Sequence, residues 1–333
     1  MKSAFVNNNP VKLKEVYAPA LLATLANEAE LGDTVYTKDY VLANKEQFAD
    51  TEYIFSTWGM PVFTSEEIKE IFKSLKCVFY AAGTVQAFAR PFIENGVHVF
   101  SAWAANAVPV AEYTVAQIIL ANKGFFAHSR EMKKRNLSAG RDMKAAYLGN
   151  FDLKVGLIGA GMIGSLVAEM LKAYKLEVLV FDPFLAPERA EKLGVKLSSL
   201  DEIFSSCNVV SNHLANNAQT QGILNGSHFS KMLPYSTFIN TGRGAQVVEA
   251  DLIKTLEERP DVTAILDVTY PEPPVEGSPF YTLPNCFLTP HIAGSLCNET
   301  HRMSEYMYAE YCAFVKGEPT RYEVSMKMLE TMA

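Results

Sequence analysis

A glycine-rich turn between a strand pattern and a helix pattern constrains the fold of this chain most strongly. The apolar run Lys154–Ile158 predicts a strand, glycines follow at positions 159, 161 and 164, and Ser165–Tyr174 has the period of a helix. Gly159 allows the tight turn, Gly161 lets the backbone approach a pyrophosphate, and Gly164 lets the helix pack closely on the strand. Free N–H groups at the start of the helix favour phosphate. The turn therefore predicts a dinucleotide site.

A carboxylate at the end of the next strand indicates which dinucleotide binds there. The strand pattern Glu177–Phe181 ends at Asp182, 18 residues after Gly164. A carboxylate at this place accepts hydrogen bonds from the ribose hydroxyls and repels a 2′-phosphate. The first arginine after Asp182 is Arg189. We therefore expect NAD rather than NADP as the cofactor.

Short apolar runs alternate with helix-period segments along the whole chain, which predicts an α/β fold with mainly parallel sheets. A length of 333 residues exceeds the ~250 to 300 at which a single core stops growing, so two domains are expected. The strands expected before the glycine turn are Ser3–Asn7, Glu52–Thr57, Cys77–Ala81 and Val97–Ser101. A helix is expected over Ser65–Lys73 with Ser65 as its cap. The further strands expected after the turn are Asn208–Asn212, Thr237–Asn240, Thr263–Asp267 and Cys286–Thr289. Six strands are the content of a Rossmann-type, doubly wound dinucleotide-binding domain.

Composition argues against several classes of partner. Thirty Lys and Arg against 37 Asp and Glu leave a net charge of −7, which disfavours nucleic acid and anionic membrane surfaces. No apolar stretch is expected to reach the ~18 to 20 residues of a membrane span, and we expect no secretory signal. Five cysteines, an odd number without a C-x-x-C pair, argue against a disulfide framework or a zinc site. These features predict a cytoplasmic protein that holds no metal.

One long segment is apolar over most of its circumference. Within Asn106–Phe126, the stretch Val108–Ala121 has few polar positions on any helical face. A helix of this kind is buried, either inside a domain or against a second subunit.

Three polar residues that follow predicted strands are candidates for catalysis. Arg243 lies between two glycines and could bind a carboxylate through its planar fork, although a structural ion pair is an equal alternative. Glu272 lies between prolines that fix its backbone, but alone it could be a solvated surface glutamate. His291 follows the last strand, and His213, which also ends a strand, competes for its role. If Glu272 and His291 pair, we expect a buried carboxylate beside an imidazole, which stabilises imidazolium so that the pair can donate a proton near neutral pH.

Five motifs, in order along the chain, resemble the D-isomer-specific 2-hydroxyacid dehydrogenase family. The matching motifs are Ala105–Thr114 (ANAVPVAEYT), the Gly159–Gly164 turn with Asp182, Thr241–Gly244 (TGRG), Asp267–Pro273 (DVTYPEP) and Pro290–Ser295 (PHIAGS). The resemblance implies hydride transfer between NAD and a 2-oxo or D-2-hydroxy acid. It implies that His291 is the acid/base, that Glu272 is its partner, and that Arg243 binds the substrate carboxylate.

The same resemblance implies a domain division and a set of contacts. Residues 1–105 and 300–333 are expected to form a smaller, flavodoxin-like substrate domain, residues 106–299 the NAD-binding domain, and the cleft between the domains the active site. The helix after Asn106 is expected to mediate a homodimer. The expected cofactor contacts are Gly159, Gly161, Met162, Ile163, Gly164, Asp182, Leu214, Ala215, Thr220, Thr241 and Asp267. The expected substrate contacts, besides Arg243, are Gly83, Thr84 and Val85.

Two departures from the family pattern concern substrate identity. The loop at Gly83 has Val85 and Ala87 where relatives often have a second glycine and an aspartate. The segment His213–Thr220 lacks the usual proline after the histidine and the first threonine. A regulatory protein that senses NAD(H) on the same fold remains the alternative function. The formate dehydrogenase branch, which generally has glutamine as the partner of its histidine, is disfavoured by Glu272.

Overall fold

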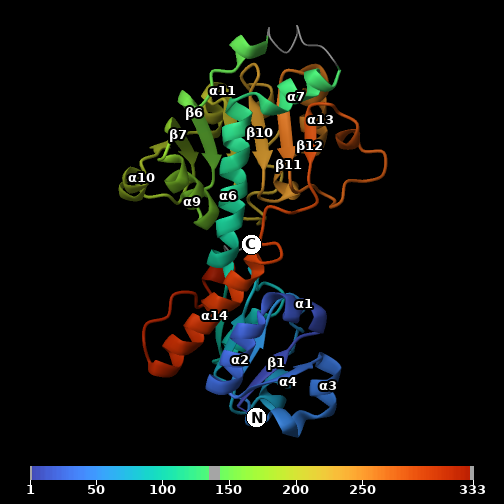
Figure 1. Cartoon of the computed structure of the whole chain (residues 1–333), viewed down its shortest axis with the longest axis vertical. Helices are drawn as coiled ribbons and strands as arrows, with labels where there is room; N and C mark the ends of the chain where they lie inside the picture. Colours follow the sequence, from blue (N-terminus) through green and yellow to red (C-terminus); the bar gives the residue numbers. More distant parts are fainter. Residues whose placement is uncertain (1, 135–142, 331–333) are drawn as a thin grey trace. The chain divides into compact units, whose positions relative to one another are not determined.

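The computed structural model describes residues 2–134 and 143–330. They form two compact units, one of residues 1–106 and 295–333 (unit 1) and one of residues 107–294 (unit 2). Each unit contains one sheet in which every ladder between named strands is parallel, with helices on both faces (Figure 1). The predicted α/β class is therefore confirmed.

The sheet of unit 1 has five strands in the order β2-β1-β3-β4-β5, the order of flavodoxin-like folds. Four of its strands lie where the apolar runs predict them. The fifth, β2, has no counterpart in the prediction, because it is an edge strand whose Gly32, Asp33 and Thr34 are exposed and break the apolar pattern. The strands are β1 (Ser3–Val6), β2 (Leu31–Tyr36), β3 (Tyr53–Ser56), β4 (Cys77–Tyr80) and β5 (His98–Ser101).

Helices cover both faces of this sheet and create two apolar cores. Along β1, Phe5 packs into one core while its neighbours Ala4 and Val6 pack into the other, as the alternation of a strand requires. One face carries α1 (Pro10–Val16), α2 (Pro19–Glu28) and α14 (Glu299–Lys316); the other carries α3 (Lys38–Ala43), η1 (Lys45–Phe48), α4 (Ser65–Ile71) and α5 (Ala89–Glu94), and η5 (Met328–Glu330) packs there too. The expected cap of α4 is wrong by one residue: the Thr64 side chain accepts from the N–H of Glu67 in a capping box, and Ser65 is the first helical residue.

The sheet of unit 2 has seven strands in the order β12-β11-β10-β9-β6-β7-β8. From β8 to β11 this is the Rossmann order 3-2-1-4-5-6, extended by one strand. The six predicted strands are present, and the short edge strand β8 is additional. The strands are β6 (Phe151–Ile158), β7 (Lys175–Phe181), β8 (Lys196–Leu197), β9 (Val209–Asn212), β10 (Thr237–Asn240), β11 (Thr263–Leu266) and β12 (Cys286–Leu288).

Helices wind doubly around the second sheet. One face is covered by α6 (Trp103–Asn122), which begins in unit 1, α7 (Phe125–Lys133), α9 (Met162–Leu171) and α10 (Pro187–Leu193). The other face is covered by α11 (Leu200–Ser206), α12 (Gly226–Phe229) and α13 (Glu249–Glu258). Short 3-10 turns are η2 (Met143–Ala146), η3 (Gly244–Gln246) and η4 (Pro279–Tyr281). The helix at the glycine turn is shifted: it starts at Met162, inside the turn, rather than at Ser165.

Helix α6 corrects the expectation that no segment reaches the length of a membrane span. It has 20 residues, and by length and composition alone it is, among the described residues, the one helix that could cross a membrane. Half of its apolar window is buried within the protein, and core helices of soluble proteins pass the same test. Pro109 and Glu112 lie within the helix.

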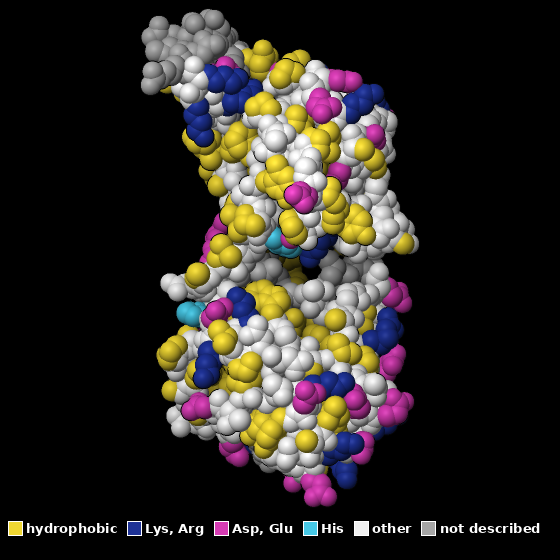
Figure 2. Space-filling view, turned by 90° about the vertical axis from the view of Figure 1, so that its right-hand side faces the viewer, with side chains coloured by type: hydrophobic (Ala, Val, Ile, Leu, Met, Phe, Trp, Pro, Cys, Tyr) yellow, Lys and Arg dark blue, Asp and Glu magenta, His cyan; other side chains and the backbone are white. Residues whose placement is uncertain are grey.

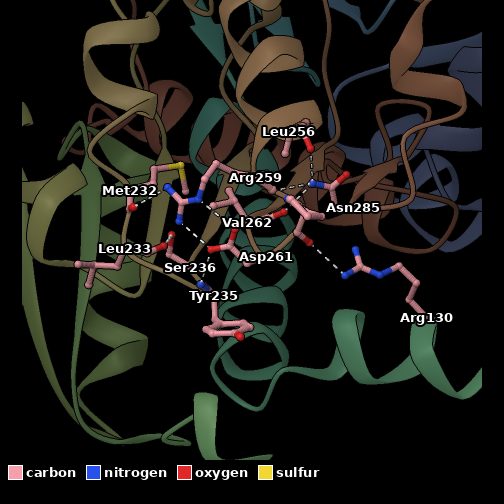
Figure 3. Close-up of polar contacts among 11 residues, drawn as sticks. Arg130, Met232, Leu233, Tyr235, Ser236, Leu256, Arg259, Asp261, Val262 and Asn285 are labelled. Atoms are coloured by element: carbon pink, nitrogen blue, oxygen red, sulfur yellow. Dashed lines mark hydrogen bonds and ion pairs between the residues drawn. The ribbon is translucent and has the colours of Figure 1, made fainter. Parts of the chain in front are cut away.

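A polar cluster ties the loops at the amino edge of the second sheet together (Figure 3). Arg259 makes a bidentate ion pair with Asp261, and the buried amide of Asn285 donates to three backbone carbonyls, those of Leu256, Arg259 and Val262. Arg130 of α7 donates to the carbonyls of Pro260 and Pro284. These contacts fix α7 to the sheet at the edge opposite to the carboxyl ends of the strands.

Candidate active site

The candidate residues of unit 2 gather at the carboxyl edge of its sheet. They follow β6, β7, β9, β10, β11 and β12, and because these strands are parallel their carboxyl ends lie at one edge. Ligands of open α/β sheets bind at this edge. Figure 1 shows the strands of the unit side by side.

The glycine turn has the geometry of a phosphate cradle. Gly159 has φ +96°, and a Cβ there would lie 3.0 Å from the carbonyl oxygen of His213. A Cβ at Gly164 would lie 2.0 Å from the carbonyl oxygen of Gly159, so a side chain cannot be accommodated. Gly161, in contrast, faces open space and caps α9 without a side chain. Met162, which is 43% exposed, and Ile163 form the first positions of the helix. The residues present fit a pyrophosphate at the helix N-terminus.

Asp182 follows β7 and lies against the glycine turn. Its Oδ2 accepts from the N–H of Ala160 at 2.7 Å, and its Oδ1 accepts from the N–H of Phe184 at 2.8 Å. Two backbone donors therefore fix the carboxylate beside the turn. A carboxylate has about four acceptor positions, so lone pairs remain for ribose hydroxyls.

The loop after β9, which carries three predicted cofactor contacts, is held by a buried glutamine. The Nε2 of Gln246 donates to the carbonyls of Leu214 and Ala215, and its Oε1 accepts from the N–H of Arg243. The hydroxyl of Thr220 donates to the carbonyl of Ala215 at 2.7 Å. Gln246 thus links this loop to the turn that carries the candidate arginine.

His213 is neutral and buried, which separates it from His291. Its Nε2 lies 2.9 Å from the hydroxyl of Ser211, and its Nδ1 lies 3.2 Å from that of Thr241. Burial lowers the pKa of His213 to about 3, so it does not carry a proton near neutral pH. Thr241 also lies 3.4 Å from the hydroxyl of Thr114 in α6, within the buried interior of unit 2. His213 is therefore unsuited to act as an acid.

The turn after β10 brings Arg243 against the segment that carries Glu272. A Cβ at Gly244 would lie 1.9 Å from the carbonyl carbon of Thr269, so only glycine allows this approach. Arg243 donates from Nη1 to the carbonyl of Gly242 at 2.8 Å. Its pKa is lowered by burial, and the charge of Glu272 opposes that effect. An arginine stays cationic in proteins, and within the described residues its other guanidinium N–H groups have no hydrogen-bond partner.

Glu272 and His291 form a pair. The Oε1 of Glu272 lies 2.7 Å from the Nδ1 of His291, and the two side chains are 40% and 46% exposed. The expectation of a buried carboxylate is therefore corrected to a half-exposed one. Because Nδ1 faces the carboxylate, Nε2 is the ring nitrogen left for a substrate, and it makes no hydrogen bond to the described part of the chain.

Asp267 fixes the turn that carries the histidine. Its carboxylate is buried and accepts from the N–H groups of Ile292 and Ala293 at 2.8 and 2.9 Å, and from the hydroxyl of Thr289. Its carbonyl accepts from the N–H of His291, whose φ of +54° lies in the left-handed region. Because that conformation is unfavourable for a residue with a side chain, these hydrogen bonds hold it in place.

Sequence reasoning missed two supporting residues. Gln246 is buried three positions after Arg243, and Glu249 accepts from the N–H of Tyr270 at 2.7 Å in the segment that leads to Glu272. Burial raises the pKa of Glu249. A polar signal exists for the first: Asn212 and Asn240 end neighbouring strands, and the amide of Asn212 contacts both Asn240 and Gln246.

The predicted substrate contacts Gly83, Thr84 and Val85 lie in unit 1, in the loop after β4. Gly83 is half-buried and its carbonyl accepts from the hydroxyl of Ser101, while Thr84 is exposed. Val85 is fully buried in a core cluster, so its side chain does not point to solvent and only its backbone could meet a substrate. No group of three potential metal ligands occurs among the described residues.

Fold and site together define an NAD-binding α/β protein of the dehydrogenase class. Residues 115–293, more than half of the chain, match the family described as D-isomer specific 2-hydroxyacid dehydrogenase, NAD binding domain. The chain belongs to this family, as its motifs predict, and NAD is the cofactor of this domain.

Individual relatives agree with this assignment. The D-3-phosphoglycerate dehydrogenase of Archaeoglobus fulgidus is 29% identical over 265 residues, which are 79% of this chain and 50% of that protein. The chain thus spans about half the length of that relative. Two solved structures share the fold over 98% of this chain. A phosphoglycerate oxidoreductase from Rhizobium etli has a TM-score of 0.84 at 18% identity over 99% of its chain. The NAD-complexed D-isomer specific 2-hydroxyacid dehydrogenase of Lactobacillus delbrueckii ssp. bulgaricus has a TM-score of 0.76 at 21% identity over 100% of its chain.

Proposed function

We propose that this protein is an NAD-dependent oxidoreductase that interconverts a 2-oxo acid and a D-2-hydroxy acid. The observation that carries the proposal is the 2.7 Å contact between Glu272 and His291, at the same sheet edge as the cationic Arg243 and the glycine turn. Reduction of the 2-oxo acid consumes one hydride and one proton. Bound NADH supplies the hydride, and NAD takes it up in the reverse direction.

Each residue of the triad has a distinct task. Arg243 offers unpaired N–H groups of a planar fork, which suit the carboxylate and carbonyl oxygens of a 2-oxo acid. His291 presents Nε2, from which a proton can pass to the carbonyl oxygen at C2. Glu272 holds Nδ1 and compensates the positive charge of the imidazolium. His213, which burial keeps neutral, could not donate this proton.

The remaining predicted contacts belong to the same proposal. Gly161, Met162 and Ile163 would hold the pyrophosphate, and Asp182 the ribose. We assign Gly83, Thr84 and Val85, by backbone groups, to the substrate. The acid itself is not assigned beyond its class, because an apolar pocket discriminates by only ~1 to 3 kcal/mol per methylene.

A panel of 2-oxo acids with NADH tests the proposal. We expect NADH oxidation with at least one member of the panel, and a product that is the D-2-hydroxy acid by chiral chromatography. A protein that binds NADH but turns over no member of a broad panel, from pyruvate to phosphorylated and aromatic 2-oxo acids, would contradict it. That outcome is the one expected of a sensor of NAD(H).

We also propose a cytoplasmic homodimer that forms through α6 and α7. Leu120, Phe125 and Met132 on these helices are 38%, 50% and 51% exposed, and exposed apolar patches are typical of protein–protein surfaces. In Figure 2 the charged side chains of unit 1 are of both signs and interleaved with apolar ones.

Light scattering tests the proposed dimer and should give twice the mass of the chain. The double variant Leu120→Asp with Phe125→Asp should give the monomer, and a monomeric wild type would contradict the proposal.

A further inference from the structure

Arg189 lies beside the glycine turn, where it contacts the same residue as Asp182, namely Ala160. It belongs to α10, and its Nη2 donates to the carbonyl of Ala160 at 3.2 Å and to the hydroxyl of Ser165 at 2.8 Å. Asp182 accepts from the N–H of Ala160 at 2.7 Å. One peptide residue of the turn is therefore contacted by the carboxylate at its N–H and by the guanidinium at its carbonyl.

The guanidinium of Arg189 has capacity left for a ligand. Its side chain is exposed, and its Nε and Nη1 make no hydrogen bond to the described residues. Asp182 lies within hydrogen-bonding distance of backbone donors but forms no ion pair with Arg189. An exposed arginine with free N–H groups is suited to bind a phosphate in a bidentate way.

We propose that Arg189 is a second determinant of cofactor choice, which attracts the 2′-phosphate of NADP while Asp182 repels it. Discrimination against NADP then depends on the Asp182 carboxylate. Because Arg189 partly offsets the repulsion of the 2′-phosphate, the protein prefers NAD over NADP by less than it would with Asp182 alone. The inference deepens the cofactor side of the proposed function. It requires only that the glycine turn binds the dinucleotide, and it is independent of the acid that is reduced.

The test measures nucleotide binding without any substrate. Dissociation constants for NADH, NADPH and 2′,5′-ADP are determined by calorimetry for the wild type and for Arg189→Gln, which removes the positive charge and keeps a polar side chain. A charge-assisted hydrogen bond is worth roughly 1.5 to 3 kcal/mol, which corresponds to about tenfold or more in affinity. We expect Arg189→Gln to weaken NADPH and 2′,5′-ADP at least tenfold and to change NADH less than threefold.

A matched control and a second background complete the test. Lys192→Gln removes a positive charge from the same helix without touching the turn, and it should change each affinity less than threefold. Asp182→Asn should bind NADPH more tightly than the wild type, which keeps the measurement possible if wild-type binding is weak. Adding Arg189→Gln to Asp182→Asn should abolish that gain.

The outcomes separate this inference from the proposed function. Equal weakening of NADH and NADPH in Arg189→Gln, or no change in either, would overturn the role of Arg189 whether or not the protein turns over a 2-oxo acid. Failure of both nucleotides to bind to the wild type would instead contradict the cofactor assignment. If Arg189→Gln does not fold, Arg189→Lys takes its place. This variant keeps the charge but loses the planar fork, so NADPH must weaken at least threefold relative to NADH; an unchanged ratio would overturn the proposal.

Discussion

Gly244→Ala tests whether the close approach of two loops sets the geometry of the candidate site. An added Cβ would lie 1.9 Å from the carbonyl carbon of Thr269 and 2.2 Å from its oxygen. Ordinary contact begins at 3.4 Å, so the two segments must separate by about 1.5 Å. The Arg243 turn and the segment that leads to Glu272 then move apart. A misplacement of about 1 Å can cost about 10²-fold in rate.

We therefore expect the kcat for the 2-oxo acid to fall about 100-fold in Gly244→Ala, with a loss of roughly 1 to 3 kcal/mol in the free energy of unfolding. The Kd of NADH should change less than threefold, since the glycine turn at residues 159–164 is not affected. Steady-state NADH oxidation, calorimetry and urea denaturation measure the three quantities. Gly32→Ala is the control, because a Cβ there meets no atom within 4 Å. A kcat within threefold of the wild type would refute the reasoning.

Three further predictions concern Asp267, His213 and Arg243. Asp267→Asn places an amide against the N–H groups of Ile292 or Ala293, so urea denaturation should show a loss of about 1 to 3 kcal/mol; an unchanged midpoint would show that the carboxylate does not fix this turn. Burial lowers the pKa of His213 to about 3, below the unfolded value of about 6.5, so between these pH values only the unfolded state takes up the proton and stability falls as pH falls. The wild type should thus lose up to about 1.4 kcal/mol more per pH unit than His213→Gln between pH 6 and 4, and parallel curves would contradict the assigned neutral state. Arg243→Lys loses the planar fork, so the KM for the 2-oxo acid should rise at least tenfold while NADH binding is kept; an unchanged KM would remove Arg243 from substrate binding.

The fold could be predicted from the sequence wherever a strand is a continuous apolar run. Thr237–Asn240 is buried throughout and was expected with the same bounds. The edge strands Leu31–Tyr36 and Lys196–Leu197 were missed, because partly solvated strands need no apolar pattern. Helix starts were shifted where a turn enters the helix, as at Met162.

Some residues of the candidate site could be predicted from local sequence patterns and others could not. Glu272 and His291 could be proposed because each follows a strand of a parallel sheet, and the structure brings their side chains into contact. Glu249 could not, since it acts by binding a backbone N–H of a segment distant in sequence, and such a partner has no signature of its own. For Gln246 the only signal is the pair Asn212 and Asn240 at the ends of neighbouring strands. The position of Arg189 beside the turn depends on the packing of α10, which periodicity does not give.

A double-mutant cycle on kcat tests the Glu272–His291 pair most directly. Glu272→Gln, His291→Asn and the double variant are compared with the wild type in NADH oxidation. If Glu272 acts only through the imidazole that it contacts at 2.7 Å, Glu272→Gln should cost at least tenfold alone and less than threefold when His291 is already asparagine. The same tenfold loss in both backgrounds would show that the two residues act independently and would contradict the proposed mechanism.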